Sequence, residues 1–234
     1  MKATWEGSGV SRRHAVAAAS LCLAVLMAGC ATGQISEVQK LQARASYERG
    51  VKAIEDGDGS GAMSAFREAV GLDPRNALYR DWLGLVWLQL LQRPDLAMDE
   101  FRRAVELDPG SADAHFHMGI ALAEQQQWPE AIASYRRALG IPALRDPELV
   151  HQSLGLAFYH LKRYREAEEA LRLALNLDPA LGMAYYNLGL VFVAEGRKEE
   201  AKRVFQRAQE VAPDAALAEA ARQQLRALGE GVFP

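Results

Sequence analysis

The sequence has little cysteine, no long apolar segment and no excess of basic charge, and each shortage excludes a class of protein. It contains 2 cysteines in 234 residues, so it cannot form the disulfide framework of a small secreted domain. Its longest apolar run, residues 15–28, is fourteen residues long, whereas a membrane-spanning helix requires about 20. The formal net charge is −3, which gives no electrostatic basis for binding nucleic acid.

The sequence also lacks the patterns of a catalytic or metal-binding site. It has no glycine-rich phosphate loop and no nucleophile-elbow motif. His115 and His117 are two residues apart, so on a helix they point in different directions and cannot share a metal. His151 falls at a packing position. We therefore predict that the chain is not an enzyme, and that it uses no metal, cofactor or small-molecule substrate.

What the sequence does contain is a pattern that recurs about every 34 residues. Five times a glycine is followed by an alanine twelve residues later, or thirteen in the second case, and a large apolar residue comes four residues after that alanine. A second alanine follows at seven residues, and four units then reach a proline. The glycine and alanine pairs are Gly50/Ala62, Gly84/Ala97, Gly119/Ala131, Gly155/Ala167 and Gly189/Ala201. Such a period is typical of stacked units that cannot bury their apolar faces alone.

Residues 148–181 illustrate one unit. Their apolar spacing predicts two helices joined by a short turn, so the helices are antiparallel neighbours. Gly155 and Ala167 lack bulk, which lets the two backbones approach closely, with Leu171 beside the contact. Pro179 ends the second helix and pushes Asp178 out of the helical region.

This combination of small residues, alanines and terminal prolines resembles the tetratricopeptide repeat family. The resemblance implies an all-α, right-handed superhelical solenoid. Five repeats are expected at 43–76, 77–111, 112–147, 148–181 and 182–215, then a capping helix at 216–228 and a flexible tail at 229–234. The third unit lacks its terminal proline and is lengthened by residues 140–147, which should change the superhelix locally.

The N-terminal segment predicts export. Basic residues precede the apolar run, whose length suits the core of a signal peptide. The run closes with Leu-Met-Ala-Gly-Cys at residues 26–30, which resembles the bacterial lipobox. That resemblance implies cleavage after residue 29 and lipidation of Cys30, with residues 30–42 serving as linker and start of the first helix. The alternatives are a plain secretory signal with an unrelated cysteine and an uncleaved anchor.

The same segment bears on redox state, charge and location. Cys22 would leave with the signal, so Cys30 would be the one cysteine of the mature chain and could form no disulfide. The mature chain would carry 24 Lys and Arg against 29 Asp and Glu, which also argues against nucleic acid as a partner. Ala31 follows the cysteine. In enteric-type lipoproteins an Asp at this position would favour retention in the inner membrane, so by analogy we expect the outer membrane, facing the periplasm.

In the tetratricopeptide repeat family the first helices line a concave surface, and the resemblance places a protein-binding groove there. One row of this surface has Asn as its family consensus, which in chaperone-binding members holds a peptide carboxylate. Here that row is aliphatic throughout, which favours an apolar groove for an amphipathic helix or a hydrophobic strand. The alternative is that this row is core between adjacent first helices. The predicted groove residues are Tyr47, Val51, Leu85, Leu88, Phe116, Ile120, Gln152, Leu156, Tyr159, Tyr186, Leu190 and Val193.

With its lipobox, its repeat number and its lengthened third unit, the chain is similar to the type IV pilus biogenesis lipoproteins. These are tetratricopeptide pilotins that help an outer-membrane secretin assemble, so the resemblance implies a secretin subunit or another pilus component as partner. Two other adaptors fit the same features: a Flp-type pilus lipoprotein and a scaffold for peptidoglycan hydrolases. Deletion distinguishes them, because loss of secretin multimers indicates a pilotin and altered septation indicates the scaffold.

Overall fold

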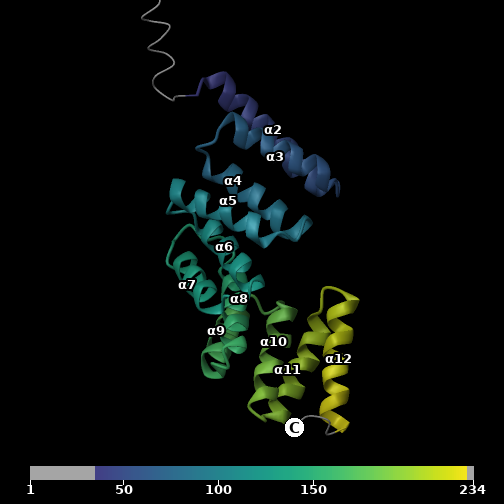
Figure 1. Ribbon diagram of the computed structural model, residues 1–234. Coiled ribbons are helices and arrows are strands. Elements are labelled where there is room, and N and C mark those ends of the chain that lie inside the picture. The colour runs from purple at the N-terminus through teal and green to yellow at the C-terminus, as the bar shows by residue number, and fades with distance from the viewer. Residues whose placement is uncertain (1–34, 231–234) are drawn as a thin grey trace, which may run out of the picture.

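The computed structural model describes residues 35–230, and the regular structure within this range is helical. The helices stack in chain order from α2 at one end to α12 at the other (Figure 1). The expected signal peptide, the lipidation site Cys30 and residues 231–234 lie outside the described range. The α-helices are α2 (Glu37–Glu55), α3 (Gly59–Leu72), α4 (Ala77–Leu85), α5 (Pro94–Leu107), α6 (Ala112–Glu124), α7 (Trp128–Leu139), α8 (Pro147–His160), α9 (Tyr164–Leu177), α10 (Gly182–Ala194), α11 (Lys198–Val211) and α12 (Ala215–Glu230).

Local sequence explains where the helices begin and end. Ser36 starts α2 through a capping box with Gln39, and Ser111 caps α6 by accepting a hydrogen bond from the Ala114 N–H. At the end of α9, Asp178 is extended, with φ of −131° and ψ of 100°, as expected for a residue before proline. The predicted helix pair of residues 148–181 is thus confirmed as α8 and α9.

Within each unit the two helices approach closely at the glycine of the repeat. A Cβ atom built on Gly119 would lie 2.4 Å from the Tyr135 ring, and one on Gly155 would lie 2.5 Å from Leu171. The glycines of the other three units face a phenylalanine ring in the same way. Since real Cβ atoms do not approach other side chains this closely, the glycine is required at this position. The predicted close contact is confirmed.

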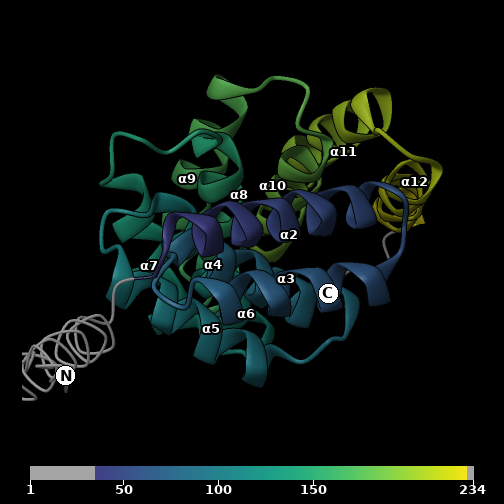
Figure 2. The same cartoon turned by 90° about the horizontal axis from the view of Figure 1, so that it is seen from above.

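The stack curves toward its first helices. Successive first helices contact one another from α4 to α6, from α6 to α8 and from α8 to α10, whereas successive second helices make no comparable contact within the described residues. In a curved solenoid the closely spaced side is the inner one. Viewed along the stack, α2 and α3 of the first unit lie side by side in front of the others (Figure 2).

The last helix, α12, closes the stack. It packs on α11 and also contacts α10, so it takes the place that the first helix of a sixth unit would have. Its buried residues are Leu217, Ala221 and Leu228. The helix continues to Glu230, so Gly229 and Glu230 belong to it and not to the tail that the sequence predicts.

The second unit accommodates its extra residue inside its first helix. After α4 the chain forms η1 (Val86–Leu90), a π-helical segment, in which the Leu91 N–H donates to the Val86 carbonyl at 3.3 Å. A π-turn holds one more residue than an α-turn. The thirteen-residue spacing of Gly84 and Ala97 therefore fits the same helix pair as the twelve-residue spacing elsewhere.

Each unit passes from its first to its second helix through one residue in the left-handed conformation. In the fourth unit the Lys162 N–H donates to the Tyr159 carbonyl at 2.8 Å, and the Arg163 N–H donates to the Phe158 carbonyl at 2.9 Å, which closes the helix end. Glycine adopts this conformation freely, while other residues adopt it at a cost. The left-handed residues, with φ between 50° and 74°, are Gly57, Gln92, Gln126, Lys162 and Gly196.

Lys162→Gly should therefore stabilise the protein. We expect a gain of about 0.5–1 kcal/mol in the free energy of unfolding, because glycine removes the strain of the positive φ. Urea denaturation followed by circular dichroism measures it. The control is Lys52→Gly on the exposed side of α2, which should lose about 1 kcal/mol through poorer helix propensity. A loss of stability in both variants would contradict the expectation.

Candidate protein-binding groove

The inner face of the solenoid carries the residues predicted to form the groove. Eleven of the twelve are half-buried on the first helices. Leu85, Ile120 and Leu190 rest on the main hydrophobic core with one side, and Val51 rests on the smaller core of the first two units. Leu156 differs, because it lines a cavity on this face and belongs to none of these packed sets. The aliphatic row of Val51, Leu85, Ile120, Leu156 and Leu190 therefore packs partly against the core and is partly open to the cavity.

Leu88 does not line the groove, although the sequence predicts that it does. Its side chain is 2 % exposed and belongs to the main hydrophobic core. The reason is the π-helical segment Val86–Leu90, which rotates the chain relative to the other first helices. At the corresponding position of other units, Tyr159 and Val193 stay half-buried on the inner face.

Two adjoining cavities lie on the inner face. The first, which we call the central cavity, encloses about 350 Å³ between α6, α7 and α8. The second, the loop-side cavity, encloses about 500 Å³ and extends the hollow to α4. Ile120, Gln152 and Ser153 line both cavities, so the hollow is continuous across three units. The central cavity is completed by Ala123, Glu124, Trp128, Tyr135 and Leu156.

The lengthened connection between α7 and α8 forms one wall of the loop-side cavity. It contributes Leu144, Arg145 and Asp146, and Leu144 also packs against the main core. The sequence predicts that this insertion alters the superhelix locally, but it does not predict that the insertion lines the groove. No sequence signal places a connection on a particular face, because its course depends on contacts between units.

Further lining residues were missed although a signal for them existed. Leu149 and Asp113 line the loop-side cavity, three residues before the predicted groove residues Gln152 and Phe116. Residues three apart on a helix share a face, so extending each predicted row by three residues would have found them. In the second and fifth units the residue equivalent to Leu149 is also apolar and exposed, and these residues are Leu78 and Met183.

Aromatic rings pack together at two places, around Tyr47 in the first unit and at Trp128 beside the central cavity. Tyr47 stacks on Tyr79 with ring centres 5.3 Å apart and lies 6.0 Å from Trp82. Trp128 stacks on His160 at 4.0 Å with nearly parallel planes. Burial raises the pKa of Tyr47 and lowers the pKa of His160, so both are expected to be neutral near pH 7.

One hydrogen-bonded pair with a buried carboxylate lies beneath the inner face. Asp81 is 3 % exposed, and its two carboxylate oxygens lie 2.9 and 3.0 Å from His117 Nδ1 on the next first helix. Because an ionised carboxylate only accepts hydrogen bonds, Nδ1 carries the proton. Asp81 and His117 therefore link the second and third units.

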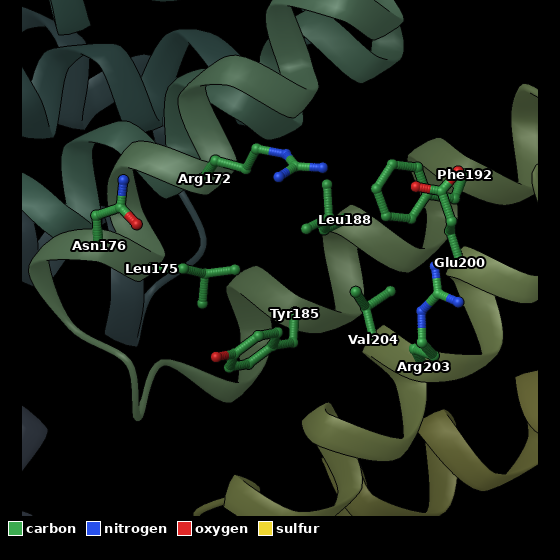
Figure 3. A pocket seen from close by; sticks show the side chains of 9 residues that line it. All are labelled: Arg172, Leu175, Asn176, Tyr185, Leu188, Phe192, Glu200, Arg203 and Val204. Carbon is green, nitrogen blue, oxygen red and sulfur yellow. The ribbon is translucent and has the colours of Figure 1, made fainter.

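A second charged cluster joins the last two units away from the groove. Arg197 pairs with Glu168, Glu195 and Glu200 and lies 4.1 Å from the centre of the Phe192 ring. The hydrogen bond from Arg197, together with a further one from Arg172, holds the pKa of Glu168 below its usual value. A separate hollow of about 370 Å³ lies beside this cluster, lined by residues of α9, α10 and α11 (Figure 3). Its charged rim includes Arg172, Glu200 and Arg203.

Residues 35–230 contain no group of three or more His, Cys, Asp or Glu side chains arranged to hold a metal ion. None of the helices in the same range has the length and apolar character needed to cross a membrane. His115 is buried, with its Nε2 3.2 Å from the Pro109 carbonyl, and His151 is half-buried with its pKa lowered by burial.

Comparison with known families identifies the architecture. Models described as tetratricopeptide repeats match residues 47–112, 89–146, 149–181 and 182–215, which together make up most of the sequence. The chain belongs to the tetratricopeptide repeat family. The predicted all-α superhelical solenoid is confirmed, since the repeats, their helix pairs and their curvature all agree with this family. Tetratricopeptide repeat proteins generally act as protein-interaction scaffolds.

Solved structures of similar fold support the assignment. A crystal structure of MamA is 26 % identical with a TM-score of 0.60, and the match covers 69 % of this chain and 93 % of MamA. The pilF protein of Pseudomonas aeruginosa is 21 % identical with a TM-score of 0.70, covering 84 % of this chain and 92 % of that one. PilW, a widely conserved type IV pilus biogenesis factor, is 20 % identical with a TM-score of 0.70, covering 84 % and 93 %. No curated protein matches the sequence.

Proposed function

We propose that the protein is a non-catalytic, lipid-anchored scaffold of the bacterial envelope whose inner groove holds an apolar segment of a partner protein. The observation that carries this proposal is the continuous hollow formed by the central and loop-side cavities. Aliphatic and aromatic side chains line it together with polar ones, and they come from three first helices, from α7 and from the connection between α7 and α8. A half-buried apolar surface of this extent is typical of a site that another polypeptide covers.

The partner we favour is an outer-membrane secretin subunit or another component of type IV pilus assembly. Two observations support this choice: the lipobox-like sequence ending at Cys30 and the shared fold of pilF and PilW. A lipid anchor on Cys30 would hold the groove near the membrane and raise its effective concentration for an incoming subunit. Covering an apolar segment until the ring closes would prevent misassembly.

Leu156→Asp tests the groove. Its side chain lines the central cavity without belonging to a packed core, so we expect the protein to keep its helicity and melting temperature. A charge in the cavity should weaken partner binding at least about tenfold. In cells, the expected readout is loss of assembled secretin multimers. Ile120→Asp should have the same effect on binding but should also cost some stability, because Ile120 rests on the core.

The matched control is Leu173→Asp. Leu173 is 49 % exposed on α9, a second helix, so it introduces the same charge outside the groove. Full secretin assembly with Leu156→Asp would contradict a role of the groove in this process. Altered septation with normal multimers would favour a scaffold for peptidoglycan hydrolases instead. Mass spectrometry of the mature N-terminus tests the anchor independently, because an unmodified Cys30 would exclude it.

A further inference from the structure

The central cavity combines an apolar interior with one charged group. Its apolar wall includes Ile120, Trp128 and Leu156, and Glu124 is the one charged residue among its lining residues. Glu124 is the last residue of α6, so its carboxylate sits where that helix meets the cavity. An occupant that filled the cavity with an apolar side chain would bring its neighbouring residues next to this carboxylate.

Glu124 has no ion pair and no hydrogen-bond partner for its side chain within the part of the chain that the structure describes. In contrast, Glu168 and Glu200 are each neutralised by Arg197. Glu124 is an exposed residue, but the partial loss of water around its carboxylate beside the cavity still raises its pKa, and no ion pair within residues 35–230 offsets this effect. An occupant that supplied a cation would remove this cost and gain a charge-assisted hydrogen bond.

The wider groove has the same sign of charge. The loop-side cavity is lined by Asp113 and Asp146 against one cation, Arg145, and His117 is engaged with Asp81. The hollow as a whole therefore carries more negative than positive charge, which favours a basic partner over an acidic one.

We propose that the occupant is a segment of a separate protein that carries a large apolar side chain next to a lysine or arginine. The apolar side chain enters the central cavity, and the cation pairs with Glu124. This inference rests on the proposed function, because it specifies the chemistry of a partner for the same groove. It makes Glu124 a determinant of specificity, while the apolar wall supplies most of the affinity.

Selection from a phage-displayed library of random twelve-residue peptides tests the proposal with the purified full-length chain. The wild type should enrich peptides in which an aromatic or branched aliphatic residue lies within four positions of lysine or arginine. Glu124→Lys should lose this preference and favour Asp or Glu beside the apolar residue. The control is Glu130→Lys, which makes the same charge change at an exposed site outside the cavity lining, and it should select the same peptides as the wild type.

Fluorescence anisotropy with one enriched peptide supplies the magnitude. Glu124→Gln should weaken its binding about three- to fivefold and Glu124→Lys about tenfold, with unchanged circular dichroism. Replacing the peptide's lysine by norleucine should remove the difference between wild type and Glu124→Gln.

The outcomes separate the two proposals. Apolar peptides enriched without a basic residue, or insensitivity to Glu124→Lys, would overturn the role of Glu124 and leave the groove intact. No enrichment at all would overturn both. Enriched peptides that match a stretch of this chain would identify a second copy as the occupant, and that would overturn the proposal of a separate partner.

Discussion

Gly119→Ala should destabilise the protein by about 2–3 kcal/mol, although it adds a single methyl group. The new Cβ would lie 2.4 Å from Cε1 and 2.5 Å from Cδ1 of Tyr135. The ring cannot move away easily, because Tyr135 is 2 % exposed and packed in the core. Either the ring leaves its preferred rotamer or α6 moves away from α7, and both reduce packing. Urea denaturation followed by circular dichroism measures the loss.

Gly71→Ala is the matched control for this substitution. Gly71 lies in α3 with nothing within 4 Å of a built Cβ, so alanine there should be neutral or stabilise by up to about 1 kcal/mol. The double variant Gly119→Ala/Tyr135→Ala should lose less than the sum of the single variants, since the methyl group then has room. Equal stability of Gly119→Ala and the wild type would show that the two helices need not approach this closely.

His117→Ala should cost about 2–3 kcal/mol, because it leaves the Asp81 carboxylate buried without its partner. The Asp81 side chain is 5 % exposed, and His117 Nδ1 provides its hydrogen bonds at 2.9 and 3.0 Å. Since the two residues belong to α4 and α6, the loss should fall on the contact between the second and third units. Thermal and urea unfolding of the variant provide the measurement.

A second substitution distinguishes the unpaired charge from lost packing. Adding Asp81→Asn to His117→Ala should recover part of the loss, because a neutral amide is less costly to bury than a carboxylate. Replacing both residues by leucine should recover most of it, as an apolar pair of similar size needs no hydrogen bonds. If the double variants were no more stable than His117→Ala, the carboxylate would not be the cause.

Within each unit, the sequence was sufficient to predict the structure. The spacing of Gly155, Ala167 and Pro179 predicted α8, α9 and the turn between them, and all three features are present. The same reasoning was wrong at Leu88, which the π-helical segment turns into the core. The extra residue was visible in the sequence, but whether it lengthens a turn or widens a helix depends on packing against α5.

The sequence predicts which helices carry the proposed groove residues, but it does not predict every residue that lines the hollow. Eleven of the twelve predicted residues lie half-buried on the first helices, because the repeat register assigns each residue to a face. Leu144, Arg145 and Trp128 were not anticipated, since the first two come from a connection and the third from the start of a second helix. Their positions follow from how three units pack together.

The sequence by itself determined the repeat, the helix pairs and the apolar character of the first helices, because these depend on contacts within about 34 residues of chain. Only the tertiary structure decided which part of the apolar face stays open, where the insertion lies and which carboxylate lacks a partner. Those features arise from contacts between units. Small rotations between neighbouring units add up along the stack, and the sequence of a single repeat does not determine these rotations.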